Sequence, residues 1–319
     1  MKKTKLLLAF GAHGDLKIEG DSKFFRKAVI PFLEEHVERG KRKAAIICEG
    51  TMPEEIPRDK AGPEPVRTVA ALYWLMRDRE GFLERATEWV AERDKKANSF
   101  FMDVADKGLL ESGTQGWPNS DFWGFEEYAM GLNRKEPGTV RFLMEPPNIE
   151  AIYMDAFRKT ISRLLRLTGE NLEFVAESMR YSMRSAMLCD KEVLGLTDQL
   201  AQEDPDIAII IPRSRSHMAM EAFFSRDRYD VFVRTGSLGE WSFESDALVR
   251  FYAGDLGERE LMLYAKLEQE LLSYTKSFRL DIVQQDRFPL EVLERVYLEA
   301  RAYAIAKNQE AAQELGIME

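Results

Sequence analysis

The sequence predicts an α/β fold in which a mostly parallel central sheet is flanked by helices, with helical insertions and a helical C-terminal part. Two observations predict this fold. Five short apolar runs have the length of buried strands, and segments with helical spacing of apolar residues separate them. Parallel strands need such long connections, and a parallel sheet covered by helices is apolar on both faces. We therefore expect a single α/β domain over residues 1–319.

The first elements are a strand, a helix and a second strand. The apolar run 5–10 ends in a glycine-rich turn, which is typical of the end of a strand. A helix with a polar cap at residues 21–22 extends to about Arg39. A second apolar strand lies within 43–50. Because His36 stands among charged residues, we expect it on the polar surface of the helix.

The rest of the chain continues the alternation of strands and helices. We expect a helical insertion at 60–135 and C-terminal helices that pack on the core at 255–319. The remaining predicted elements are strands at 139–145, 206–212 and 229–235, and helices at 149–167, 171–203, 258–276 and 288–314.

The composition limits the partners of the chain. Its 45 Lys and Arg residues against 55 Asp and Glu residues give a net charge of −10, which disfavours nucleic acid. No stretch approaches the roughly 20 apolar residues of a membrane helix. The apolar stretch near the N-terminus is at the lower length limit for a secretion signal, and no cleavage site follows it. Cys48 and Cys189 lie in predicted core elements, so we expect no disulfide and a cytoplasmic location. The oligomeric state stays open, with a homo-oligomer as one option.

Polar side chains follow four of the five predicted strands. Parallel strands end at one edge of a sheet, and ligands bind there in open α/β folds. We therefore expect these side chains to converge on one site, with arginines suited to an anionic small-molecule substrate. They are His13 and Asp15, Glu49, Glu145, and Arg213, Arg215 and His217.

Each of these residues also has an ordinary structural interpretation. His13 fits a loop histidine without a partner, and Glu49 and Glu145 fit solvated residues at strand ends. The segment GAHGDLK lacks the glycine spacing of a phosphate-binding loop. His13, Glu49 and His217 supply the three protein ligands that a catalytic metal needs, although no short metal-binding motif is present. No G-x-S-x-G turn supports a serine hydrolase.

The order of these motifs resembles the erythromycin esterase, TraB and ChaN-like superfamily. The matching segments are GAHGD (11–15), IICEG (46–50), RSAM (184–187) and IAIIIPRSRSH (207–217). The sequence departs from the superfamily pattern at Ala12, where an acidic residue is usual, and at Ser214, where glycine is usual. The resemblance implies a parallel α/β core and a role for His13, Glu49, Arg184 and His217. It also implies ester hydrolysis, metal-dependent peptide cleavage or haem binding, without choosing among them.

These observations favour a hydrolase that activates water against an ester, amide or phosphoester of an anionic small substrate. His13 is the expected general base and Glu49 its orienting partner. Arg184 and one of Arg213 or Arg215 are expected to hold oxyanion charge or a substrate anion. The cofactor stays open, with a divalent metal ion ahead of haem. The alternatives are a non-catalytic binding protein for haem or an anionic metabolite, and an interaction protein with a vestigial site.

Overall fold

The protein, described from a computed structural model, divides into two compact units. The first comprises Met1–Met52, Trp89–Pro147 and Cys189–Ser237, and the second Pro53–Glu88, Asn148–Leu188 and Leu238–Glu319. The helical insertion expected at 60–135 therefore contributes to both units, and the single domain expected over 1–319 remains a prediction. The structure describes residues 3–11, 20–49, 71, 74–107, 125–168, 172–235, 250–251, 254 and 256–266.

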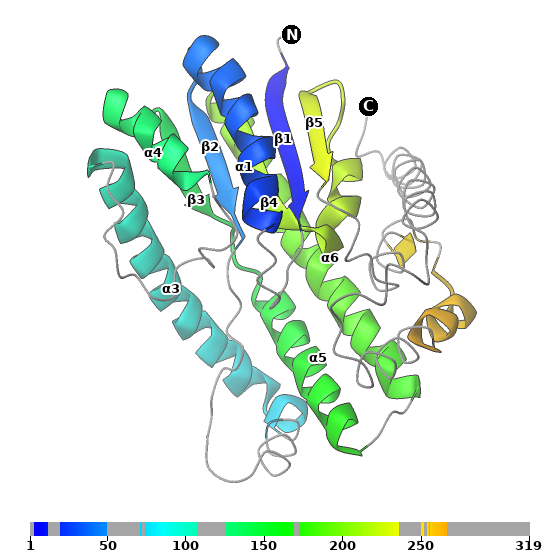
Figure 1. Cartoon of the computed structure of the whole chain (residues 1–319). Coiled ribbons are helices and arrows are strands. Elements are labelled where there is room, and N and C mark those ends of the chain that lie inside the picture. Colours follow the sequence, from blue (N-terminus) through cyan, green and yellow to red (C-terminus); the bar gives the residue numbers. More distant parts are fainter. Residues whose placement is uncertain are drawn as a thin grey trace. The chain divides into compact units, whose positions relative to one another are not determined.

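A sheet of five parallel strands forms the centre of the first unit, in the order β3-β2-β4-β1-β5 (Figure 1). Its all-parallel pairing confirms the predicted α/β class. β4 lies in the middle, between β2 and β1. The strands are β1 (Thr4–Gly11), β2 (Ala44–Cys48), β3 (Val140–Met144), β4 (Ala208–Ser214) and β5 (Tyr229–Thr235).

The central strand β4 begins and ends two residues later than the predicted 206–212. A turn precedes it, because Ile207 N–H donates to the Asp204 carbonyl at 3.1 Å. At its other end the pairing with β1 continues until Ser214 lies opposite Gly11. Arg213 is consequently part of the strand and does not follow it, which fixes the direction of its side chain.

One face of the sheet is covered by α1 (Gly20–Leu33), η1 (Glu34–Arg39) and α4 (Glu126–Lys135). Phe25 and Val29 of α1 are fully buried against alternate strand residues. Gly11 at the end of β1 has no room for a side chain, because a Cβ there would lie 2.5 Å from the Phe25 ring. Asn133 ties α4 to β3 through two hydrogen bonds of 2.8 Å with the backbone of Val140.

The expectation that His36 lies on the surface is wrong. The helix does extend to Arg39 as predicted, but its last turn is a π-helix, and His36 is buried there. Its ring lies 4.6 Å from the Phe32 ring and 5.3 Å from the Phe232 ring. The physical reason is the spacing, because His36 follows Phe32 by one helical turn and continues the apolar stripe of α1.

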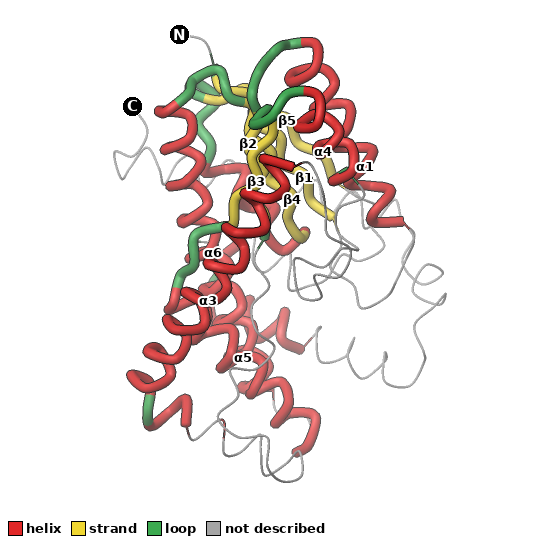
Figure 2. The backbone as a smooth tube through the Cα atoms, turned by 90° about the vertical axis from the view of Figure 1, so that its left-hand side faces the viewer, coloured by secondary structure: helices red, strands yellow, loops and turns green. Residues whose placement is uncertain are grey.

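The opposite face of the sheet is covered by the C-terminal half of α6 (Leu172–Glu203), as Figure 2 shows edge-on. Asp190, Val193 and Thr197 of this half are completely buried. The connection after β4 is η3, a 3-10 helix at Arg215–Phe223.

The second unit contains helical segments that pack through aromatic side chains. It includes α5 (Ile149–Thr168), the first half of α6 and the start of α3 (Arg79–Lys107). Tyr153 of α5 lies 5.6 Å from Phe82 and donates a hydrogen bond to the Leu75 carbonyl at 3.0 Å. Of the C-terminal helices expected at 255–319, a helix at 258–266 is described, and Leu261 and Ala265 are buried in it. Among the described helices, none has the length and apolar character to span a bilayer.

Candidate functional site

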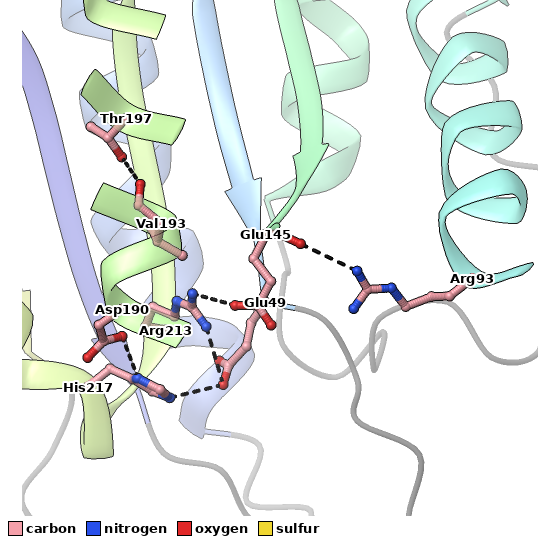
Figure 3. Close-up of polar contacts among 8 residues, drawn as sticks. All are labelled: Glu49, Arg93, Glu145, Asp190, Val193, Thr197, Arg213 and His217. Carbon is pink, nitrogen blue, oxygen red and sulfur yellow. Dashed lines mark hydrogen bonds and ion pairs between the residues drawn. The ribbon is translucent and has the colours of Figure 1, made fainter. Parts of the chain in front are cut away.

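Five charged side chains meet at the carboxyl ends of β2, β3 and β4 in the first unit (Figure 3). We call this set the charge cluster. It takes one side chain from α6, one from η3 and the others from the strands or their ends. Its members are Glu49, Glu145, Asp190, Arg213 and His217.

Strand alternation places three members of the charge cluster on the same face of the sheet. Cys48 and Met144 pack with the α1 and α4 face, so the next residues, Glu49 and Glu145, fall on the α6 face. Arg213 lies there too, three residues after Ile210 of the α1 face. The prediction that Cys48 belongs to the core is confirmed, and both cysteines are free and buried, so no disulfide forms.

The pairing of the strands also makes room for these side chains. β2 and β3 pair up to Cys48 and Met144, whereas β2 and β4 pair only up to Ile46 and Ile210. β2 and β4 therefore lose their backbone pairing before either strand ends. Glu49 and Arg213 meet where this pairing has ended.

His217 lies between two carboxylates. Its Nδ1 lies 2.7 Å from Asp190 Oδ1, and its Nε2 lies 3.5 Å from Glu49 Oε1. Because an ionised carboxylate can only accept hydrogen bonds, Nδ1 carries a proton and donates a hydrogen bond to Asp190. Burial favours the neutral ring, but Asp190 and then Glu49 outweigh it and raise the pKa of His217 to about 10. The ring is thus a doubly protonated imidazolium at neutral pH.

Arg213 is the second cation and is also shared by two carboxylates. Its Nη2 forms an ion pair with Glu145 Oε2, and its Nη1 lies 3.9 Å from Glu49 Oε1. Although the side chain is 1% exposed and burial disfavours its charge, Glu145 and Glu49 raise the pKa of Arg213 above its ordinary value. The charges alternate in sign from Asp190 through His217, Glu49 and Arg213 to Glu145, with one net negative charge.

Arg93 of α3 supports the charge cluster from outside (Figure 3). Its Nη2 donates to the Glu145 backbone carbonyl at 3.4 Å, and it pairs with Asp94 at 2.8 Å. The guanidinium also lies 5.7 Å from the Trp89 ring. These contacts connect α3 to the end of β3, where the side chain of Glu145 meets Arg213.

The predicted convergence is confirmed for the members that the structure describes, because Glu49, Glu145, Arg213 and His217 lie together. His13 and Asp15 lie outside the described residues, so their roles stay predictions. Arg215 begins η3, but its side chain is not among those described. Arg184 belongs to the second unit and its side chain is exposed.

Asp190 was not predicted, and it is the member that orients His217. It comes from the middle of a long helix and not from a strand end, where we expected the site residues. The sequence does contain a signal for the burial of Asp190, because Val193, Thr197 and Leu200 follow it at helical spacing and are all buried. An aspartate that continues such a stripe must lie in the core, where a carboxylate needs a partner.

The described residues only partly fit the predicted metal set of His13, Glu49 and His217. The Asp190–His217 hydrogen bond is the arrangement that commonly orients a metal-binding histidine. However, Arg213 already supplies a positive charge to Glu49, which opposes a second cation there. Within the described parts of the chain, no group of three or more His, Cys, Asp or Glu side chains is arranged to hold a metal ion. We therefore assign no step to a metal.

Comparisons with known proteins leave the site as the main guide to function. Neither models of protein families, nor curated proteins, nor solved structures give a match to this chain.

Proposed function

We propose that this chain is a hydrolase that activates water against an ester, amide or phosphoester bond of a small anionic substrate. One observation carries the proposal, namely the Asp190–His217 hydrogen bond that leaves Nε2 facing Glu49. An oriented imidazole beside a carboxylate is a common arrangement for acid–base catalysis. Its position at the carboxyl edge of a parallel sheet is where α/β enzymes bind their substrates.

In the proposed reaction, Glu49 is the base and His217 the acid. A water molecule gives a proton to Glu49, and its oxygen bonds to the acyl carbon or phosphorus of the substrate. The bond to the leaving group breaks, and the leaving group takes the Nε2 proton of His217. A proton transfer from Glu49 to Nε2 then restores both groups. Asp190 acts as a positioning residue, because it holds the ring through Nδ1.

Two remaining roles rest on the resemblance to the erythromycin esterase, TraB and ChaN-like superfamily: Arg184 stays a candidate for binding a substrate anion and His13 for a further acid–base role. Arg215 and Asp15 stay candidates for substrate binding because of their positions after predicted strands. Arg213, which pairs with Glu145 in the interior, is better suited to holding Glu49. Two free, buried thiols support a cytoplasmic location.

The test is hydrolysis of a panel of chromogenic esters, amides and phosphoesters. We expect His217→Gln and Glu49→Gln each to lower kcat/KM by about a hundredfold to ten-thousandfold, the usual contribution of an acid or base. His36→Gln is the matched control, because it changes the other described buried histidine, and it should leave kcat/KM unchanged. Equal rates in the wild type and His217→Gln would remove His217 from the mechanism.

A second candidate is a non-catalytic protein that binds an anionic metabolite at the same place. The two buried cations, Arg213 and His217, favour it. A protein that hydrolyses none of the panel but binds such a ligand would support this candidate. Metal analysis and a visible spectrum of the same preparation would test the predicted divalent metal ion and the less favoured haem.

A further inference from the structure

Each cation of the charge cluster has one close carboxylate and one distant carboxylate. His217 lies 2.7 Å from Asp190 but 3.5 Å from Glu49. Arg213 forms a close pair with Glu145, whereas its contact with Glu49 is 3.9 Å. Hydrogen bonds between charged groups are normally about 2.7–2.9 Å long. Within the charge cluster, the contacts of Glu49 are therefore the longest ones.

The two cations also share one acceptor atom of Glu49. Both of the contacts to Glu49 converge on a single oxygen, Oε1. An anion with two or more oxygens at this place would offer His217 Nε2 and Arg213 Nη1 one acceptor each, whereas Glu49 offers both of them the same oxygen.

The charges and the exposure also allow Glu49 to be replaced. Without Glu49, the pairs His217–Asp190 and Arg213–Glu145 are each neutral, so one bound anion restores the charge that Glu49 supplies. Glu49 is the most exposed member, with 18% of its side chain exposed against at most 10% for the others. Of the three carboxylates, it is therefore the one that solvent and a ligand reach most readily.

We propose that the position between Arg213 and His217 is an anion-binding subsite, which Glu49 occupies in the resting protein and a carboxylate or phosphate group of a small ligand takes over. The ligand oxygens accept hydrogen bonds from His217 Nε2 and from Arg213 Nη1. The displaced Glu49 is then released from both cations, which makes it a stronger base beside the bound ligand.

This inference is separable from the proposed hydrolysis, because binding is measured directly. Isothermal titration calorimetry at neutral pH is carried out with inorganic phosphate and, separately, with acetate. Glu49→Gln removes the competing charge, so we expect it to bind one of them at least about tenfold more tightly than the wild type does. Adding His217→Gln to Glu49→Gln should abolish that gain. Tighter binding of phosphate indicates a phosphate-bearing ligand, and tighter binding of acetate a carboxylate-bearing one.

The matched control is Glu38→Gln, which removes a carboxylate of η1 that pairs with Lys135 of α4. An equal gain in Glu38→Gln, or no gain in Glu49→Gln, would overturn the subsite. If Glu49→Gln does not fold, the wild type is titrated with phosphate while the imidazole resonances of its three histidines are followed by NMR. At constant ionic strength the His217 signals should move and those of His36 should not. Unmoved His217 signals would overturn the subsite as well.

Discussion

The amino and carboxyl edges of the same sheet each hold a buried histidine, and the two histidines have opposite electrostatics. His36 and His217 are both 8% exposed. At the amino edge, His36 lies among the rings of Phe32 and Phe232, and burial lowers its pKa, with only partial opposition from Glu35. At the carboxyl edge, carboxylates outweigh burial and raise the pKa of His217 to about 10. Partners, and not burial, therefore decide whether a core histidine is charged.

The ion pairs at the two edges differ in the same way. Lys5 and Asp230 pair at the amino edge with 25% and 45% of their side chains exposed. Arg213 and Glu145 pair at the carboxyl edge with 1% and 7% exposed. Burying two charges is expensive and does little for stability compared with apolar packing. Charges that are nevertheless buried at the edge where α/β proteins bind ligands make the charge cluster a candidate functional site.

The largest expected effect is the loss of Arg213. Arg213→Met leaves Glu145 buried without its cation, which should lower the free energy of unfolding by about 3–5 kcal/mol. The double variant Glu145→Leu and Arg213→Met removes both charges and should recover most of that loss. Urea denaturation monitored by circular dichroism measures both. A double variant as unstable as Arg213→Met would mean that Arg213 stabilises the fold through packing and not through charge compensation.

The next effect is a difference in how pH changes stability at the two edges. The pKa of His217 rises on folding. Its contribution to the free energy of unfolding is therefore full below the unfolded pKa of about 6.5 and is lost as pH rises through about 10. The pKa of His36 falls on folding, so its contribution is full above about 6.5 and is lost as pH falls further. Each effect changes the free energy of unfolding by at most about 1.4 kcal/mol per pH unit.

Comparing the wild type with His217→Gln and with His36→Gln measures these two contributions. Urea denaturation is repeated from about pH 5 to about pH 10. The stability gap between the wild type and His217→Gln should narrow on the alkaline side. The gap for His36→Gln should narrow on the acidic side instead. Two gaps that change in parallel with pH would show that the surroundings of the two histidines are alike.

The strands and their polar ends could be predicted from sequence, because both follow from local pattern. Apolar runs marked all five strands, and parallel pairing then gathered Glu49, Glu145, Arg213 and His217 at one edge. The exact pairing could not be predicted. The structure places Glu49 beside His217 and Arg213. Its expected role of orienting His13 stays a prediction, because His13 lies outside the described residues. Contacts between strand ends depend on strand order, which no local pattern specifies.

Two residues on helices show the other limit. Asp190 was missed and His36 was assigned to the surface, although both continue a stripe of buried residues at helical spacing. In each case the neighbouring charged residues in the sequence concealed the position of the side chain on the helix. Whether a polar residue in such a stripe is buried depends on a partner that the fold supplies from elsewhere, as β5 supplies Phe232 to His36.

The smallest effect concerns the exposed ion pair of the amino edge. A double-mutant cycle with Lys5→Met and Asp230→Asn should give a coupling energy of only about 0.2–1 kcal/mol, because solvent screens both side chains. The hydrogen bond from Lys5 also lowers the pKa of Asp230. This coupling should therefore be fully present at pH values above the usual pKa of aspartate and disappear as pH falls through the lowered pKa. High salt should weaken it as well. The coupling energy could instead be as large as the loss of unfolding free energy in Arg213→Met, or salt could leave it unchanged. Either result would mean that solvent screens charges at the amino edge as little as at the carboxyl edge. Burial of charge would then no longer distinguish the charge cluster from the amino edge.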